Sequence, residues 1–251
     1  MAHHFADIGN TRIKIAKVVG DNVVRVFHGD HALVDKEICS SVKLLSNVGM
    51  SELRKKSLFG TCLTIHDMVG HIPLTLAYQD PMSFGQDRLA AMMGAWGALQ
   101  KVDKRGILAV LDAGSCVTID VLDNKGCHLG GNIDIGLQWR LDAVHDYADN
   151  LPLLDFDLVK DSTVSPHSFL AANTKDALAY GIVSGFLRQQ QQSLKFCIER
   201  YGVNYLYITG GLGSWINSFL AEEDWAKEGG CEIFVDEDLV IRGLSDIFAH
   251  E

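Results

Sequence analysis

Two short turns carry the residues best suited to phosphate chemistry. Asp7-Ile-Gly-Asn-Thr11 and Asp112-Ala-Gly-Ser115 each combine an aspartate, a glycine and a polar side chain. A glycine lets backbone N–H groups approach phosphate oxygens, and an aspartate holds a cation directly or through water. Lys14 follows the first turn, from where its ammonium group could reach a phosphate oxygen. A single turn of this kind is a common loop. Its repetition, each time with the same kinds of segment before and after it, favours a nucleotide site.

The same series of elements surrounds both turns and must position them. After each turn, an alternating stretch, a polar glycine-containing turn and a second alternating stretch predict a β-hairpin. These parts span 12–19, 20–22 and 23–27 in the first copy and 117–122, 123–126 and 127–132 in the second. The order of parts predicts an α/β fold with two similar halves, residues 1–104 and 105–251, each with strands first and helices after.

Apolar periodicity predicts the helices that support these turns. The expected helices cover 86–100, 137–147, about 175–201 and a segment from Leu239, with further strands over 205–209 and 232–235.

The helix predicted from residue 86 begins with Gly85-Gln-Asp87-Arg88, which admits two interpretations. Ser83 and Gln86 match a capping box, so Asp87 would simply be an acid in the first helical turn. Alternatively, Asp87 is a general base beside an anion-binding Arg88. A weak base is sufficient for phosphoryl transfer, in which positioning dominates the catalysis.

Two later segments each admit two interpretations as well. Asn173 can cap the long helix, with Asp176 in its first turn, while Thr174 could offer its hydroxyl to a ligand at that helix end. Thr209-Gly210-Gly211 follows a predicted strand. Its glycines permit close approach to an adenine or ribose, although an ordinary strand-to-helix turn has the same pattern.

Composition and missing motifs exclude several function classes. The net charge of −10 argues against nucleic-acid and anionic-membrane partners, and the sequence contains no apolar run long enough to span a membrane. The six cysteines form no C-x-x-C pair, which favours a reduced, cytoplasmic compartment. A Walker A loop, a dinucleotide-binding glycine motif, a histidine metal cluster and a nucleophile elbow are all absent from the sequence.

The ordered set of motifs resembles that of type III pantothenate kinases. The resemblance runs from residue 7 to about residue 213, and each motif is weak alone, whereas the ordered series is specific. The matching segments are Asp7-x-Gly-Asn-Thr11-x-x-Lys14, Gly85-x-Asp87-Arg88, Asp112-x-Gly-Ser-x-x-Thr118-x-Asp120, Gly130-Gly-x-Ile133-x-x-Gly136, Asn173-Thr174 and Thr209-Gly-Gly211.

The resemblance implies a fold of two ribonuclease-H-like halves around a cleft, as in actin-like ATPases. It implies ATP-dependent phosphorylation of pantothenate, the first step of coenzyme A biosynthesis, with Asp87 as the base. It further implies Mg²⁺ near Asp7, a monovalent cation (K⁺ or NH₄⁺) at Asp112, and a homodimer. The implied ATP-binding residues are Asp7, Ile8, Gly9, Asn10, Thr11, Arg12, Ile13, Lys14 and Ser115, and the implied pantothenate-binding residues are Tyr78, Gly85, Gln86, Asp87, Arg88 and Thr174.

Three positions depart from the family pattern. Ser115 stands where threonine is usual, Cys116 where alanine is common and Ile135 where proline is typical. None of these changes removes a proposed chemical group, because the hydroxyl at position 115 is retained. Two other functions fit the same motifs: a kinase of another small hydroxy acid or a sugar, and a nucleotide-binding accessory factor of transcription without turnover.

Overall fold

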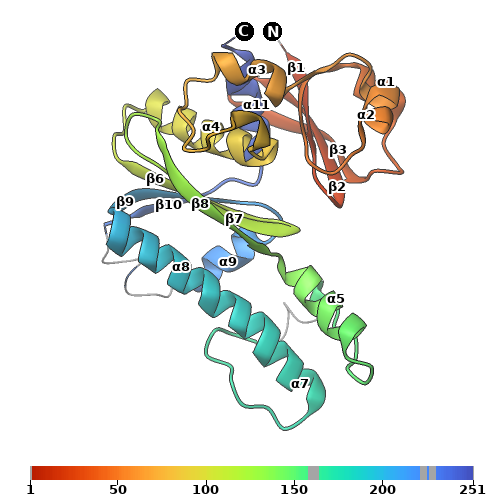
Figure 1. Ribbon diagram of the computed structural model, residues 1–251, viewed down its shortest axis with the longest axis vertical. Coiled ribbons are helices and arrows are strands. Elements are labelled where there is room, and N and C mark those ends of the chain that lie inside the picture. The colour runs from red at the N-terminus through yellow and green to blue at the C-terminus, as the bar shows by residue number, and fades with distance from the viewer. Residues whose placement is uncertain (1, 158–163, 221–224, 226–229, 251) are drawn as a thin grey trace.

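The computed structural model describes residues 2–157, 164–220, 225 and 230–250 (Figure 1). It contains two five-stranded mixed sheets, with strand orders β3-β2-β1-β4-β5 and β10-β9-β6-β7-β8. In each sheet, three antiparallel strands are followed by two strands that add in parallel on the other side of the first strand. The predicted α/β fold with two similar sheets is confirmed.

The first sheet and its helices come from the N-terminal part of the chain. The predicted hairpin is present as β2 and β3, while the segment 36–72, to which sequence patterns assigned no element, supplies a central strand and short helices. The elements are β1 (His3–Ile8), β2 (Arg12–Val19), β3 (Asn22–Asp30), α1 (Lys36–Ser40), β4 (Val42–Asn47), α2 (Glu52–Phe59), β5 (Leu63–Thr64), α3 (Ile65–Met68) and α4 (Gln86–Lys101).

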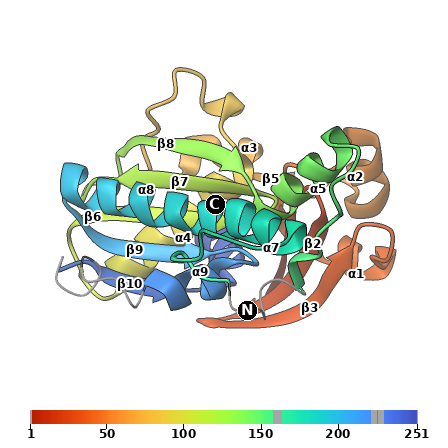
Figure 2. The same cartoon turned by 90° about the horizontal axis from the view of Figure 1, so that it is seen from below.

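The second sheet follows the predicted order of elements closely. The helix expected over 175–201 is present, but it contains a π-helical segment, Ala179–Ser184, between α7 and α8. Figure 2 shows α7 and α8 in one line along a face of the second sheet. The elements are β6 (Ile107–Ala113), β7 (Cys116–Leu122), β8 (His128–Ile135), α5 (Leu137–Tyr147), α7 (Thr174–Leu178), α8 (Gly185–Tyr201), β9 (Val203–Thr209), α9 (Gly213–Leu220), β10 (Glu232–Val235) and α11 (Leu239–Phe248).

Helices α4 and α11 lie between the two sheets and share one apolar core with both (Figure 1). This core contains Phe5 and Leu44 of the first sheet and Leu108 and Tyr207 of the second. The two helices pack closely at Gly243, where an added Cβ would lie 1.8 Å from the carbonyl oxygen of Ala90. The C-terminal helix therefore stiffens α4, the helix that carries Asp87. The division of the chain at residue 104 stays a prediction.

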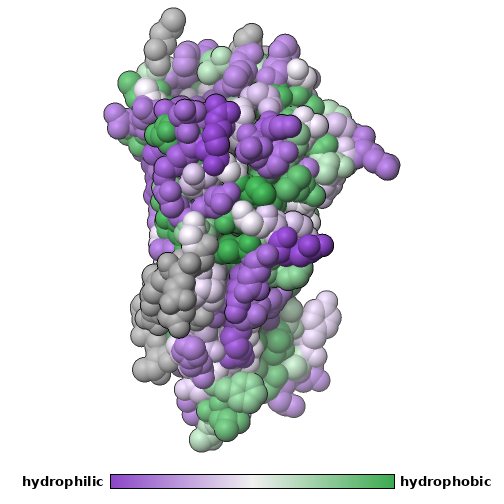
Figure 3. Space-filling model, turned by 90° about the vertical axis from the view of Figure 1, so that its left-hand side faces the viewer, coloured by the Kyte–Doolittle hydropathy of each residue, from purple (hydrophilic) through white to green (hydrophobic). Residues whose placement is uncertain are grey.

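Exposed large apolar side chains occur along the chain, from Val19 to Val235, and some of them lie near α7. Figure 3 shows one apolar patch at the lower end of the molecule, where Figure 1 places α7, and others in the middle and upper parts. Phe169 and Leu170, in the loop before α7, are 75% and 86% exposed. Among the described residues, no helix is both long and apolar enough to cross a membrane.

Candidate active site

The two D-x-G turns face each other between the sheets. Asp7 lies at the end of β1 and Asp112 at the end of β6, and the hydroxyls of Thr11 and Ser115 are hydrogen-bonded to each other. Residues more than a hundred positions apart in the sequence therefore form one site. The pseudo-repeat seen in the sequence thus corresponds to two phosphate-type turns on opposite walls of a single site.

Three carboxyl groups converge on this site. Burial raises the pKa of Asp7 to about 6, with the nearby charge of Asp87 as a second cause. Burial raises the pKa of Asp112 to about 7, and the charges of Asp87 and Asp7 add to the effect. Burial also raises the pKa of Asp87. Buried acids whose pKa values are raised by desolvation, and at Asp7 and Asp112 also by neighbouring carboxylates, are typical of a site that binds cations or transfers protons.

The first turn is braced by residues that sequence patterns did not single out. The imidazole Nε2–H of His31 donates to the carbonyl of Gly9 at 2.9 Å, and the Val48 N–H donates to the carbonyl of Ile8 at 3.0 Å. An added Cβ at Gly49 would lie 2.0 Å from the Gly9 oxygen, so only glycine fits there. The sequence feature that could have identified this segment is the polar, glycine-containing stretch that follows the apolar residues of β4.

The second turn is braced by two glycine positions that belong to the sequence motifs. The Gly136 N–H at the start of α5 donates to the Ser115 carbonyl at 3.0 Å. Gly210 has a φ of +84°, and an added Cβ would lie 2.5 Å from Asp112 Oδ1. The segment Thr209 to Gly211 therefore lies directly against the second turn, beside Asp112.

Asp87 lies in the first turn of α4 and is partly buried. Its Oδ1 accepts the backbone N–H of Arg88 at 2.8 Å. The capping box of Ser83 and Gln86 is absent, because the N-cap is Gly85, two residues after Ser83, and the Ser83 hydroxyl donates to the Asp80 carbonyl instead. Asp87 is therefore placed by the α4 terminus itself rather than by a side-chain cap.

Gln86 and Arg88 are both buried by contacts with protein groups. The Gln86 amide oxygen accepts the Asn47 N–H at 3.1 Å, and its nitrogen lies 3.2 Å from His66 Nδ1. The Arg88 guanidinium bonds both oxygens of Asp120, through Nε at 2.9 Å and Nη2 at 2.6 Å. These two predicted substrate-binding side chains thus join α4 to its neighbours.

Lys14 and Tyr78 occupy the edges of the site. The Lys14 ammonium group donates to the carbonyl of Glu237 and lies 3.5 Å from a carboxylate oxygen of Asp238. Tyr78 is 37% exposed, and its hydroxyl accepts a hydrogen bond of 3.2 Å from Arg88. Lys14 thus follows the turn that the sequence assigned to ATP, and Tyr78 contacts Arg88, which the sequence assigned to the substrate.

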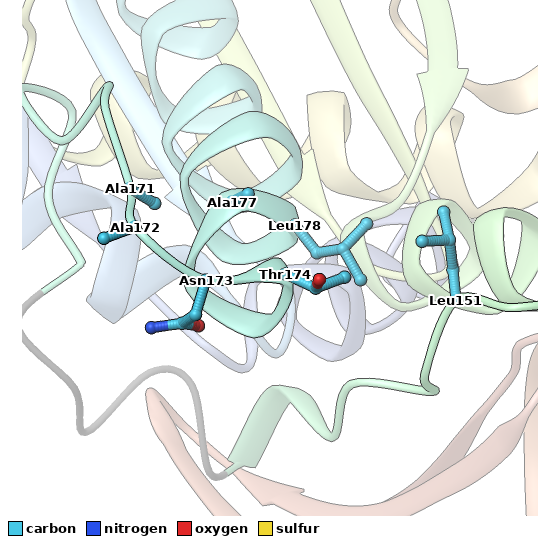
Figure 4. Close-up of a pocket in the computed structure, with 7 residues that line it drawn as sticks. All are labelled: Leu151, Ala171, Ala172, Asn173, Thr174, Ala177 and Leu178. Atoms are coloured by element: carbon cyan, nitrogen blue, oxygen red, sulfur yellow. The ribbon is translucent and has the colours of Figure 1, made fainter.

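Thr174 lies apart from these residues within one chain. Asn173 caps α7 as predicted, accepting the Asp176 N–H at 3.0 Å. The Thr174 hydroxyl points into a pocket of about 450 Å³ between Leu178 and Leu151 (Figure 4). Figure 1 places α7 at the lower end of the molecule, well away from α4, which lies between the two sheets. A single chain therefore does not bring Thr174 to Asp87.

The sequence also matches a known family. The family model of type III pantothenate kinases matches residues 25–195. This chain belongs to the type III pantothenate kinase family. A type III pantothenate kinase of Flavobacterium johnsoniae is 29% identical over 260 residues, with 98% of this chain and 96% of the relative covered.

Solved structures agree with the fold of a kinase in this family. A conserved Campylobacter jejuni protein assigned to the Baf family of transcriptional activators superposes with a TM-score of 0.60 at 22% identity, covering 98% of this chain and 97% of its own. A glucokinase from Balamuthia mandrillaris superposes with a TM-score of 0.57 at 12% identity, covering 98% and 93%. At these identities the superpositions establish the fold alone.

The acidic residues of the site are of the type that can hold a divalent metal ion. Asp7 Oδ1 is buried and has no hydrogen-bond partner within the described part of the chain. An unpaired buried carboxylate oxygen is a suitable ligand for a hard cation such as Mg²⁺ or K⁺. The described residues contain no cluster of three or more His, Cys, Asp or Glu side chains that would enclose a metal ion. Phosphate oxygens and water would have to complete the coordination.

Proposed function

We propose that this protein transfers the γ-phosphoryl group of ATP to the primary hydroxyl of pantothenate, giving 4′-phosphopantothenate in coenzyme A biosynthesis. The observation that carries the proposal is the convergence of Asp87 with the two facing phosphate-type turns. Burial raises the pKa of Asp87, which makes it a better base than an exposed aspartate. Membership of the type III pantothenate kinase family supports pantothenate as the acceptor.

The proposed roles follow from the positions of the two turns. The first turn, residues 7–14, holds the phosphates of ATP, and Ser115 supplies a hydroxyl from the opposite wall. Thr209 to Gly211, beside the second turn, lies on the adenosine side. Asp87 accepts or orients the proton of the attacking hydroxyl, while Tyr78 and residues 85–88 hold pantothenate. Fixing the hydroxyl close to the transferring phosphorus provides most of the rate enhancement in such reactions.

Two cations complete the proposed site. Asp7 would hold Mg²⁺, directly or through water, and Asp112 would hold K⁺ or NH₄⁺. When bound, these ions offset negative charge on the phosphoryl group that is transferred. The unpaired oxygen of Asp7 and the pKa of Asp112, raised to about 7 by burial and by neighbouring carboxylates, support this assignment.

A homodimer would bring Thr174 to the substrate. Thr174 lies far from Asp87 of its own chain, and exposed apolar side chains, Phe169 and Leu170 among them, surround its end of the molecule. We therefore place Thr174 of a second copy against pantothenate bound at Asp87. The enzyme would work in the cytoplasm, in keeping with its six free cysteines.

Measuring product directly tests the proposal. Purified protein with ATP, MgCl₂ and pantothenate should form phosphopantothenate, whereas a panel of sugars and other hydroxy acids should react much more slowly. Asp87→Asn should lower kcat by about 10²–10⁴-fold, because the variant cannot accept a proton. A near-normal rate for this variant would exclude Asp87 as the base. High activity in sodium buffer, without K⁺ or NH₄⁺, would exclude the monovalent cation.

Mixing inactive variants tests the dimer. Asp87→Asn and Thr174→Ala are each expected to be poorly active, but mixed dimers would contain one site with both native residues. Activity should therefore reappear after the two variants are unfolded and refolded together. Asp87→Asn refolded with itself is the control. A monomeric protein by light scattering, or no recovery in the mixture, would contradict this arrangement.

A further inference from the structure

Arg88 takes part in a buried ion pair that joins α4 to the second sheet. It belongs to the first turn of α4, directly after Asp87, while Asp120 belongs to β7 of the second sheet. The two side chains are only 5% and 3% exposed. A bidentate arginine–carboxylate pair with this burial has a fixed geometry, and separating it would leave an uncompensated charge inside the protein.

His128 holds the carboxylate from the other side. Its Nε2 lies 2.9 Å from Asp120 Oδ1, and its side chain is fully buried. Since a carboxylate accepts hydrogen bonds, Nε2 carries the proton. Asp120 therefore receives three hydrogen bonds: two from Arg88 and one from His128. His128 is the first residue of β8, so the network covers one helix and two neighbouring strands.

Aromatic rings close the remaining sides of the arginine. The guanidinium carbon lies 4.4 Å from the ring centroid of Phe84, and that ring contacts His128 edge-on at 5.2 Å. Such stacking stabilises a desolvated guanidinium group. The Tyr78 hydroxyl accepts one further guanidinium hydrogen bond.

Gly131 provides the space that the ion pair needs. It lies opposite Asp120 in the pairing of β7 with β8. An added Cβ would lie 2.2 Å from Asp120 Oδ1 and 2.9 Å from Arg88 Nη2. The second glycine of the Gly130-Gly131 pair is thus required by the close approach of the network, which sequence reasoning did not foresee.

We infer that Asp120 and His128 are positioning residues for the reaction: through Arg88 they hold the first turn of α4, and with it Asp87, against the second sheet. The inference rests on the proposed role of Asp87. Because Asp120 binds Nε and Nη2 of Arg88, this arginine links the helix to the second sheet in addition to its proposed contact with pantothenate. Any contact of Arg88 with the substrate would use the guanidinium N–H groups that Asp120 leaves free.

The test compares two substitutions of His128 that fill similar space. His128→Phe keeps a ring against Phe84 but removes the hydrogen bond to Asp120, whereas His128→Gln keeps an N–H donor at a similar reach. His128→Phe should lower kcat roughly 10-fold with little change in KM for ATP, because small displacements of a catalytic group reduce the rate strongly. His128→Gln should restore most of kcat.

Hydrogen exchange of the unliganded protein gives a second readout. In His128→Phe, the backbone amides of residues 86–90 should exchange faster than in the wild type, while His128→Gln should match it. Gly131→Ala should also accelerate exchange there, and Gly70→Ala, where an added Cβ meets nothing within 4 Å, is its control. Should His128→Phe fail to fold, His128→Asn, whose amide is too short to reach Asp120, replaces it in the comparison with His128→Gln.

The two measurements separate the two hypotheses. Wild-type exchange and wild-type kcat in His128→Phe would overturn the positioning role. A wild-type protein that does not phosphorylate pantothenate would refute the proposed function, and the exchange of residues 86–90 would then still decide whether His128 holds the helix.

Discussion

Two ion pairs beside the active site each join a sheet to a helix, and they differ in burial. Arg88 and Asp120 form a bidentate pair beside the second turn, with side chains 5% and 3% exposed. Lys14, next to the first turn, lies 3.5 Å from Asp238, with both side chains 17% exposed. Arg25 binds the same Asp238 and is 39% exposed. One pair is sealed inside the protein, and the other is in contact with solvent.

The difference in burial indicates that the two ion pairs have different roles in the site. A buried, geometrically fixed pair is expensive to break and keeps its partners in place. A partly exposed lysine contributes little stability through its ion pair and exchanges partners easily. Arg88 is therefore suited to holding α4, while Lys14 is suited to leaving Asp238 for a phosphate oxygen of ATP.

The largest expected effect is at the buried pair. Asp120→Asn leaves the Arg88 guanidinium without a counter-charge inside the protein, so the free energy of unfolding should fall by about 3–5 kcal/mol. Urea denaturation followed by circular dichroism measures this change. A loss of less than about 1 kcal/mol would mean that the buried pair contributes no more to stability than a solvent-exposed pair does.

The two turns themselves should differ in their response to pH. The pKa values of Asp7 and Asp112 are raised to about 6 and about 7, so the folded protein binds protons that the unfolded chain has released. Folding stability should therefore decrease as pH rises from about 4, and the full penalty should be present above about pH 7. By linkage the loss of stability should be about 3 kcal/mol at Asp7 and larger, about 4 kcal/mol, at Asp112, whose pKa is raised further.

Melting temperatures of the unliganded protein between pH 5 and pH 8, without K⁺ or Mg²⁺, test this expectation. Asp112→Asn should melt higher than the wild type at pH 8 and similarly at pH 5, and Asp7→Asn should show a smaller gain. If Asp112→Asn keeps the pH dependence of the wild type, the pKa of Asp112 is not raised by burial and by the neighbouring carboxylates.

Sequence patterns found the repeated turns because each carries its glycine and aspartate within a few residues. The strands around them were also predictable, since hairpins rest on local alternation and local turns. The network of Arg88, Asp120 and His128 was not predictable, although Arg88 and Asp120 were each part of a motif. Its members come from three elements, and only the docking of α4 onto the second sheet brings them together.

Local patterns also misassigned parts of the site. Ser83 and Gln86 have the spacing of a capping box, but the Gln86 side chain bonds the Asn47 backbone and approaches His66 instead. A tertiary contact therefore replaced the local one. The π-helical segment after α7 likewise has no marker in the apolar periodicity. Residues 46–50 were missed because their contact with the first turn depends on the parallel pairing of β4 with β1.

The smallest expected effect is at the exposed pair. Asp238→Asn should change the free energy of unfolding by less than about 1 kcal/mol, since Asp238, Lys14 and Arg25 all remain in contact with solvent and Arg25 keeps its ion pair with Glu237. Because Lys14 then loses a competing carboxylate, KM for ATP should fall by about twofold at low ionic strength, and the difference should shrink as salt screens the charges. Steady-state kinetics at two salt concentrations measures it. A rise in KM for ATP would instead mean that Asp238 holds Lys14 in the position needed for nucleotide, so that both pairs, exposed and buried, would serve to fix geometry.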